Sequence, residues 1–420
     1  MILAAGPAQP HPEPAGWWAG DAHVHCDCGV AGGASVTPEY LLEAMKVNDL
    51  AVISVLADMG NGEVRDAVRD LPRVNGRDDP QSVPRRILHW DAEWHFDPQG
   101  VTFERKAIGG HLIVLGLPHA EPRFSEFTYP ILHWARSQHA VAGYAHMQYL
   151  SGGIPNKLDC CAPLEYPVET ALGQASFVME DVNGGDTAIE AYYRLLNCGF
   201  RPGLAAATDF PCNFRKPIGS LLTYALVPGN RLTYRRWIEA LGNGRTVISR
   251  NGHREFLDVK VNQRESPGAE IRLRRPGAVT VDVNWTATEN LHGRLELVRN
   301  GAVVYSREDS AAPRSAVTLH QTVDFRRSGW LCARVMDASG HRVHSAATFV
   351  KVSGAPVRAS ARDAEFFVQW IDNLIDRTTP PGDWSKYLLH DRQQAHARYR
   401  KAREIYKEIA AEARRENEVK

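Results

Sequence analysis

The stretch Gly20-Asp21-Ala22-His23-Val24-His25 places two histidines one residue apart. In an extended strand, the side chains at positions i and i+2 project from the same face of the sheet. We therefore expect His23 and His25 to project side by side, while Val24 points to the opposite face and packs. Two imidazoles that converge at a strand end provide the nitrogen ligands of a metal site. The alternative is a pair of hydrogen-bonded histidines on a polar strand face, and the rest of the chain decides between the two.

The composition is that of a globular protein with more than one core. The chain has 420 residues, of which 44% are hydrophobic and 23% charged, and this length predicts two or three domains. Lysine plus arginine and aspartate plus glutamate both number 49, so the formal net charge is zero. A neutral chain argues against a nucleic acid or an anionic membrane as the main partner. We expect a small-molecule substrate, and a homo-oligomer stays open.

The seven cysteines do not resemble a disulfide framework, because they are odd in number and spread over a long chain. Cys26 and Cys28 lie close to the histidine pair, but no Cys-x-x-Cys pair accompanies them, which disfavours a zinc site of the thiolate type. Cys160 and Cys161 are expected to be incidental loop residues.

The start of the chain gives no clear sign of a targeting segment. Residues 1–16 are rich in proline and alanine and lack the basic start and long apolar centre of a signal peptide. No apolar run approaches the roughly 18 residues of a membrane span. We expect no membrane association, and the compartment, cytoplasmic or periplasmic, stays open.

The first half of the chain alternates between expected helices and apolar strands. Thr37, Pro38 and Glu39 are an N-cap, a first helical residue and a first-turn acid, and they predict a helix to about residue 48. Residues 51–57 are continuously apolar, as in a strand buried on both faces. Further strands are expected at 86–90, 111–116, 140–145, 176–179 and 204–207, and helices at 131–138 and 187–198. This alternation predicts an α/β fold with a parallel sheet closed into a barrel.

Acids and histidines recur where these expected strands end. Asp58, Glu93, His146 and Asp209 all fall at or just past such an end. In a parallel barrel the carboxyl ends of the strands share one face, on which active sites are built. His111 is the exception, because it stands at the start of its strand.

From about residue 254 the apolar period changes to two. Asn300-Gly301 lies between two alternating segments and predicts a hairpin with a type I′ turn. We expect an immunoglobulin-like β-sandwich over residues 254–353 as an accessory domain. Residues 360–420 are expected to be helical, with a break at 380–382 and a second helix from about Trp384 or Lys386. The first of these helices carries an apolar stripe, which packs on the other domains or, as the alternative, on a partner: Phe366, Phe367, Trp370, Ile371 and Leu374.

Eight segments, in chain order, resemble the motifs of the PHP metallohydrolase superfamily, in its branch related to carbaryl (aryl N-methylcarbamate) hydrolases, CehA/McbA-like. Residues 20–25 resemble the opening G-D-x-H-x-H, residues 54–61 stand where the family has a strand ending in D-H-N, and Glu93 stands at a bridging glutamate. Residues 110–116 resemble G-H-x-x-x-L-G, 145–146 the A-H pair, 180–184 E-x-x-N-G, 207–209 the S/T-D segment, and 244–249 a closing G-R-T-Y-V-T strand. The resemblance covers about residues 17–253 and also suits the sandwich and the helical tail.

The resemblance implies a distorted (β/α)7-type barrel over residues 17–253 that holds divalent metal ions, zinc in the first place and manganese or iron as alternatives. It implies that Glu93 bridges two metals. The first metal would also take His23, His25 and Asp209, and the second would also take His111 and His146.

Three departures from the family pattern fall on the ligands of a third metal. Met59 replaces a histidine after Asp58, Asp209-Phe210-Pro211 replaces D-x-H, and no histidine stands near Ala31. We therefore predict a dinuclear centre, in which Asp58 orients a histidine without binding metal. A decayed, inactive site is the alternative.

The resemblance implies a hydrolase in which a metal-bound, bridging hydroxide attacks the carbonyl of an ester, carbamate or amide. Glu93 and Asp209 would be the catalytic carboxylates, with Asp209 accepting the hydroxide proton and passing it to the leaving group. Tyr149, Asn183 and Arg215 are candidates for substrate contacts because each follows a strand-end motif. The rivals are a phosphoesterase, in which Arg215-Lys216 clamps the phosphate, and a metal- or ligand-binding module without turnover.

Overall fold

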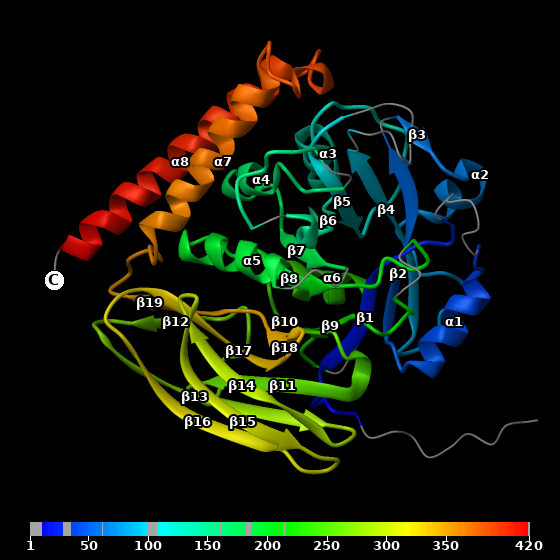
Figure 1. Cartoon of the computed structure of the whole chain (residues 1–420). Coiled ribbons are helices and arrows are strands. Elements are labelled where there is room, and N and C mark those ends of the chain that lie inside the picture. The colour runs from blue at the N-terminus through cyan, green and yellow to red at the C-terminus, as the bar shows by residue number, and fades with distance from the viewer. Residues whose placement is uncertain are drawn as a thin grey trace, which may run out of the picture.

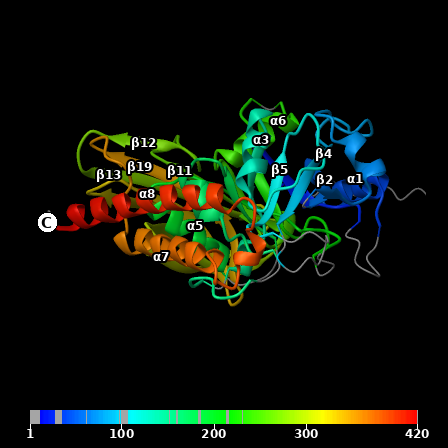
Figure 2. The ribbon, with the colours of Figure 1, turned by 90° about the horizontal axis from the view of Figure 1, so that it is seen from above.

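The structure is a computed structural model, and it describes residues 11–27, 35–60, 62–96, 98, 107–150, 152–158, 161–181, 186–212, 216–229 and 231–418. An α/β part formed by the first half of the chain lies beside a β-sandwich formed by the second half, and two long helices, α7 and α8, extend across the top (Figure 1). Viewed from above, α7 and α8 lie side by side over the sandwich side of the molecule (Figure 2).

One sheet organises the α/β part. Its central order is β10-β9-β1-β2-β4-β5-β6-β7-β8. All nine residues of β2 are buried, as expected for a continuously apolar strand with packed layers on both faces. The bounds of these strands are β1 (Trp17–Val24), β2 (Val52–Gly60), β4 (Ile87–Phe96), β5 (Gly110–Leu115), β6 (Val141–Tyr144), β7 (Phe177–Glu180), β8 (Gly203–Ala206), β9 (Leu222–Leu226) and β10 (Thr246–Ser249), and the short β3 (Glu63–Val64) pairs with β2.

The sheet is mixed, so the expectation of a parallel sheet is wrong in part. β1, β2 and β4 are parallel to one another, and so are β6, β7 and β8. β5 runs antiparallel to both of its neighbours, and β9 and β10 continue the sheet from β1 by antiparallel pairing. β8 reaches β10 through a side chain, because the Thr246 hydroxyl donates to the Leu204 carbonyl at 2.6 Å.

The helices of this part begin and end where local chemistry predicts. α1 (Pro38–Val47) starts after Thr37, whose hydroxyl accepts from the Tyr40 amide at 3.4 Å, so the predicted cap is confirmed. α5 (Thr187–Asn197) is followed by Gly199, whose φ of 92° lies in the left-handed region that glycine enters without strain. The other helices are α2 (Ala67–Asp70), α3 (Tyr129–Ser137), α4 (Tyr166–Ala171) and α6 (Tyr234–Gly242).

The second half forms strands of period two, as predicted. Asn300 and Gly301 both have positive φ, 51° and 84°, and join β14 to β15 in the predicted hairpin. One sheet has the order β11-β13-β16, and the other strands extend the large sheet. The bounds are β11 (Glu255–Val261), β12 (Glu270–Leu273), β13 (Gly277–Ala287), β14 (Leu291–Arg299), β15 (Ala302–Ala311), β16 (Val317–Phe325), β17 (Gly329–Asp337), β18 (Gly340–Ser345) and β19 (Thr348–Val352).

The two halves share a sheet. β10 of the first half pairs antiparallel with β18 of the second, with Val247 opposite Ser345 and Ser249 opposite Val343. The hydrogen-bonded sheet therefore continues without a break across the domain boundary that we place at residue 253. This continuity brings residues of the sandwich close to the strand ends of the α/β part.

The tail forms α7 (Ala361–Thr378) and α8 (Arg392–Glu418). The expected start of the second helix is wrong, because residues Ser385–Tyr387 form only a 3-10 turn and the long helix begins at Arg392. The apolar stripe of α7 is packed within the chain: Phe367, Trp370, Ile371 and Leu374 are buried, and Phe366 is partly so. The Trp370 indole also donates to the Leu164 carbonyl at 2.8 Å.

From the number of cysteines we expect no disulfide framework, and the structure corrects this expectation at two of them. Cys161 and Cys212 are each disulfide-bonded, so Cys161 is not incidental. Cys26, Cys198 and Cys332 are free and buried. Within the part of the chain that the structure describes, no helix is long and apolar enough to cross a membrane.

Candidate metal centre

Glu93 is the centre of a buried cluster of histidines. It lies within β4, three residues before the end, because this strand continues past the predicted end at Trp90. Its side chain is 1% exposed. The two carboxylate oxygens face different pairs of imidazoles, and in the strand order these pairs come from opposite sides of β4.

The Oε2 atom of Glu93 faces the histidine pair of β1. It lies 3.2 Å from His23 Nε2 and 2.9 Å from His25 Nε2, and these two nitrogens lie 3.2 Å apart. Asp209 Oδ1 completes this side at 3.3 Å from His23 Nε2 and 3.7 Å from His25 Nε2. The two histidines converge as their i, i+2 spacing predicts, and three of the four donors lie close enough to share one ion.

The Oε1 atom of Glu93 faces a second pair. It lies 3.1 Å from His111 Nδ1 and 3.5 Å from His146 Nε2, and these two nitrogens lie 3.0 Å apart. All three side chains are buried. The structure thus brings together all six residues for which we predict a metal-binding role.

The reversed direction of β5 explains why His111 belongs to this cluster. In a parallel strand, its position at the strand start would place it at the opposite edge of the sheet. β5 runs antiparallel to β4, and His111 lies opposite His95 near the carboxyl end of β4. The start of β5 therefore reaches the edge at which the other strands end.

Two residues of the cluster hold a left-handed backbone. His146 follows β6 and has a φ of 57°, and Asp209 follows β8 and has a φ of 54°. Histidine and aspartate enter this region more readily than most residues, although at a cost. Such strain is common where a side chain must point into a functional site.

The outer nitrogens of the histidines have partners that fix their orientation. His25 Nδ1 lies 3.2 Å from the Leu56 carbonyl oxygen, which accepts a hydrogen bond from that nitrogen. Asp181 Oδ2 lies 2.9 Å from His146 Nδ1 and 3.4 Å from His23 Nδ1. A carboxylate or carbonyl behind a histidine fixes the tautomer that leaves Nε2 free to bind a metal.

Asp181 is a functional residue that the sequence analysis did not single out. It directly follows Glu180, at the end of β7, in the E-x-x-N-G segment. The strand-end rule that selects Asp58 and Asp209 also applies to Asp181, and this rule was the available signal.

His95 is the second residue that was missed. Its Nε2 lies 3.1 Å from Glu93 Oε2 and 2.6 Å from Asp58 Oδ1. Asp58 therefore contacts a histidine outside the predicted ligand set, and its other oxygen accepts from Arg65 Nε at 2.8 Å. The signal was the i, i+2 spacing of Glu93 and His95, which puts both on one face of β4.

The positions at which the family pattern is lost hold apolar side chains. Met59 and Pro211 are both buried, and Pro211 follows Phe210, whose carbonyl accepts from the His25 amide at 2.7 Å. Neither side chain offers the imidazole that a third metal would take there.

The substrate contacts are less defined. The Tyr149 ring lies 5.7 Å from the His146 ring, and its side chain is half-exposed beside the cluster. Asn183 and Arg215 lie outside the described residues, as do Cys28 and Ala31.

The charged groups of the cluster shift one another's pKa values: burial opposes it, but the neighbouring carboxylates raise the pKa of His95 to about 10 and that of His146 to about 9. Burial lowers the pKa of His111 to about 3, so this imidazole is neutral, the form that binds a metal. Burial raises the pKa of Asp209 to about 6, although the nearby histidines oppose this. Burial alone would raise the pKa of Glu93, but the positive charge on His23 and His95 holds it well below its usual range.

The donor set fits divalent metal ions. Imidazole nitrogens that lie 3.0–3.2 Å from one another and from a shared carboxylate have the spacing of ligands around a common ion. His111 turns its Nδ1 toward the Glu93 carboxylate and toward His146, while its Nε2 is buried with no hydrogen-bond partner among the described residues. Buried groups that could hold a metal are therefore present, and mixed nitrogen and oxygen donors suit zinc, manganese and iron.

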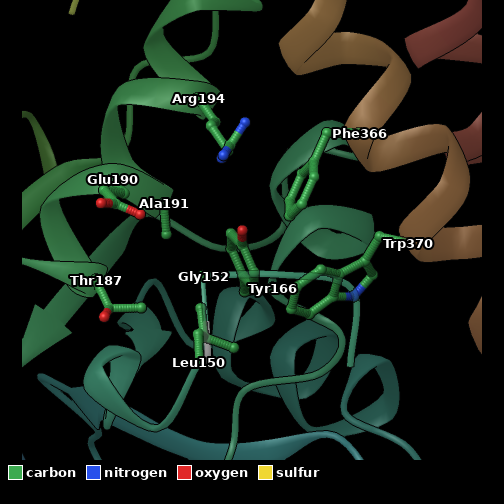
Figure 3. A pocket seen from close by; sticks show the side chains of 9 residues that line it. All are labelled: Leu150, Gly152, Tyr166, Thr187, Glu190, Ala191, Arg194, Phe366 and Trp370. Atoms are coloured by element: carbon green, nitrogen blue, oxygen red, sulfur yellow. The ribbon is translucent and has the colours of Figure 1, made fainter. Parts of the chain in front are cut away.

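A separate small pocket lies between α5 and α7, and it contains none of the residues of the cluster (Figure 3). Leu150, Tyr166, Phe366 and Trp370 form its apolar wall. Arg194 lies against it, and its charge is paired with Asp363 at 2.7 Å.

Comparison with known proteins does not identify the chain. No protein-family model matches it, and no curated protein matches it. One similar solved structure is a complex of zinc 2-glycoprotein and prolactin inducible protein from human seminal plasma, with 13% identity, 23% of this chain and 93% of that chain covered, and a TM-score of 0.19. Two others are structures of the CARDB domain of the PF1109 protein from Pyrococcus furiosus, one of them in complex with di-metal ions. Each is 14% identical to this chain, covers 24% of it and has a TM-score of 0.18, and the match covers 97% of the first and 89% of the metal-bound domain. Similarity at this level carries no argument about fold or function.

Proposed function

We propose that the chain is a metal-dependent hydrolase of the PHP type, with a distorted barrel and a dinuclear centre, that cleaves a carbonyl ester, carbamate or amide. The observation that carries the proposal is the position of Glu93, whose two oxygens face two separate sets of nitrogen donors. A carboxylate placed in this way can bridge two ions, as the family resemblance implies.

In this proposal His23, His25 and Asp209 hold one ion with Glu93, and His111 and His146 hold the other with Glu93. Asp181 and the Leu56 carbonyl keep the imidazoles turned toward the ions. When bound, two such cations, of zinc or alternatively of manganese or iron, would activate water at neutral pH and polarise the carbonyl oxygen of the substrate.

Asp209 is the proposed proton carrier. Its side chain is 13% exposed, while His23, His25 and Glu93 are almost fully buried, so it is the carboxylate of the cluster with access to solvent. This access lets Asp209 exchange protons with water, as a general base must. Asp209 accepts a proton from the attacking water and delivers it to the leaving oxygen or nitrogen.

Two alternatives remain distinct from this proposal. A phosphoesterase would need cationic groups such as Arg215 and Lys216 to clamp the phosphate. The loss of the third-metal histidines at Met59 and Pro211 favours carbonyl substrates, because PHP phosphoesterases often keep that metal. A metal-binding module without turnover is the alternative from another class.

A substrate panel tests the proposal. Purified, metal-loaded protein is assayed with naphthyl N-methylcarbamate, nitrophenyl acetate, nitroanilides and nitrophenyl phosphate. We expect release of naphthol, nitrophenol or nitroaniline from one or more carbonyl substrates, and loss of that release by at least 100-fold in Asp209→Asn.

The matched control for this panel is Asp282→Asn. Asp282 lies in the sandwich, pairs with His320 at 2.6 Å and is distant in sequence from the residues of the cluster. This variant should keep full activity. If the protein hydrolyses only nitrophenyl phosphate, the phosphoesterase alternative is correct and the proposal is wrong. If it hydrolyses none of the esters or amides, the binding module is favoured.

A further inference from the structure

A second cluster of possible ligands lies where the N-terminal segment meets both halves of the protein. His11 and Glu13 come from this segment, Asp49 precedes β2, and His253 lies in the 3-10 turn Gly252–Arg254 that leads into the sandwich. The function proposed above uses none of these four residues.

Their donor atoms converge. His11 Nδ1 lies 3.3 Å from Glu13 Oε1 and 3.2 Å from Asp49 Oδ2. His253 Nε2 lies 2.6 Å from the other oxygen of Glu13. Ligands about 2.0–2.1 Å from a tetrahedral zinc ion lie about 3.3 Å from one another, so two of the three contacts already have this spacing. The third is a hydrogen bond that would lengthen.

The backbone around this cluster is held by contacts that need no ion. The Thr286 hydroxyl donates to the Pro12 carbonyl at 2.5 Å, and the Val227 amide donates to the Gly16 carbonyl at 2.8 Å. The His253 ring also packs edge-on against the Tyr224 ring, with centroids 5.4 Å apart. The ligands are therefore positioned in advance, which reduces the entropy lost when a metal binds.

The cluster is separate from the candidate metal centre. Asp49 lies before the amino end of β2, and Asp58 lies near its carboxyl end. Residues 52 to 58 of an extended strand already span about 20 Å. A change in one cluster should leave the ligands of the other in place.

We propose that His11, Glu13 and His253, whose ligand atoms all lie within 4.8 Å of one another, form a peripheral site for a divalent transition metal of the zinc class, with Asp49 beside His11 as its fourth ligand after a small shift. Two imidazole nitrogens and two carboxylate oxygens are a zinc-type donor set and differ from the all-oxygen sets of calcium and magnesium. With neutral histidines the two carboxylates carry a charge of −2, which a divalent cation balances. The bound ion would tie the N-terminal segment to the turn before β2 and to the start of the sandwich.

Equilibrium dialysis of chelator-stripped full-length protein against zinc at pH 7.5, followed by elemental analysis, counts the ions per chain. We expect His11→Ala and Glu13→Gln each to bind one ion fewer than the unmodified protein. His11 is exposed at the surface, so its variant should fold. The control is His320→Ala, which removes another surface histidine paired with a carboxylate and should leave the count unchanged.

Two further readouts make the result decisive. Zinc should raise the Tm of Glu93→Ala, which keeps the peripheral site, and the rise should disappear when His11→Ala is added. Equal zinc counts in the unmodified protein and in His11→Ala would overturn the peripheral site, whatever happens at Glu93. A count lowered by His11→Ala but not by Glu93→Ala would instead support the peripheral site and contradict the dinuclear centre.

Discussion

At the scale of single residues, the candidate centre depends on which nitrogen of each histidine points inward. Asp181 decides this for two of them, because one of its oxygens contacts the outer nitrogen of both His146 and His23. It is fully buried, and the charge of His146 helps to hold its pKa below the usual range against the effect of burial. Asp181 is thus an anion that positions two ligands from behind.

Asp181→Asn tests this role. The amide keeps the shape of the side chain but loses the charge, and its NH2 group cannot accept a hydrogen bond from an imidazole, so only one acceptor oxygen remains. We expect zinc affinity at the centre to fall by 10- to 100-fold, the usual cost of losing such a partner. The affinity is measured by competition with a chromophoric chelator. An unchanged affinity would mean that Asp181 has no role in orienting the ligands.

The residue scale also shows how far the sequence could predict the site. The six ligands were predictable because strand ends and i, i+2 spacing both have simple geometric consequences. His95 was missed because β4 continues beyond the apolar run, into residues whose burial depends on the cluster itself. The disulfide bonds of Cys161 and Cys212 could not be predicted, since pairing depends on distances in the folded chain.

At the scale of elements, the end of β7 links the candidate centre to the sandwich. Glu180, the residue before Asp181, is buried and accepts from Arg250 Nη2 at 2.8 Å. His341 of β18 lies 3.4 Å from Glu180 and 2.7 Å from Asp186. Through His341, the second half of the chain therefore contacts the strand end that carries Asp181.

Arg250→Met tests this link. Removing one partner of a buried ion pair leaves an uncompensated charge, so we expect a loss of about 3 kcal/mol in the free energy of unfolding. We also expect weaker zinc binding at the centre, because Asp181 is no longer held in place. Both quantities are measured on the same preparations, by urea unfolding and by chelator competition.

The control for Arg250→Met is Arg342→Met. Arg342 pairs in the same way with the buried Glu255, and its Nη2 lies 3.0 Å from a carboxylate oxygen, but the two residues lie in β18 and β11, neither of which pairs with β7. It should cost a similar amount of stability and leave zinc affinity unchanged. If both variants lose the same zinc affinity, the loss is a general effect of lower stability and does not depend on the contact between Arg250 and Glu180.

Among the helices and strands, features set by neighbouring residues can be predicted from the sequence, and features set by contacts between distant segments cannot. The caps of α1 and α5 and the Asn300-Gly301 hairpin follow from a few neighbouring residues and are confirmed. The antiparallel direction of β5 and the pairing of β10 with β18 depend on contacts between distant segments. Apolar periodicity predicts a strand but does not define its neighbour or its direction.

At the scale of the whole molecule, the helical tail docks on the α/β part through buried acids. Glu165 accepts from the Thr128 amide at 2.7 Å and from the hydroxyl of Tyr399 in α8. Burial, together with the charge of Glu169, raises its pKa to about 7. Glu169 pairs with Arg398 of α8 at 2.6 Å, so two acids share the interface with one arginine.

This interface predicts a pH dependence of stability. The folded-state pKa of Glu165 lies above its unfolded value of 4.5, so folding favours the protonated acid. Its contribution is fully present below pH 4.5 and is lost as the pH rises to about 7, by about 3 kcal/mol for a shift of this size. We expect Glu165→Gln to gain stability relative to the unmodified protein between pH 4 and pH 8, as measured by urea unfolding. A constant difference between the two would show that Glu165 is not buried as a neutral acid.

The central claim is that Glu93 bridges two metal ions, and the metal content of Glu93→Ala tests it most directly. Both proteins should carry the His11→Ala change, which removes the proposed peripheral site, and elemental analysis should follow dialysis against zinc. We expect two zinc ions per chain with Glu93 in place, and none retained at the centre in Glu93→Ala. Equal zinc content in the two proteins, or no bound zinc in either, would contradict it.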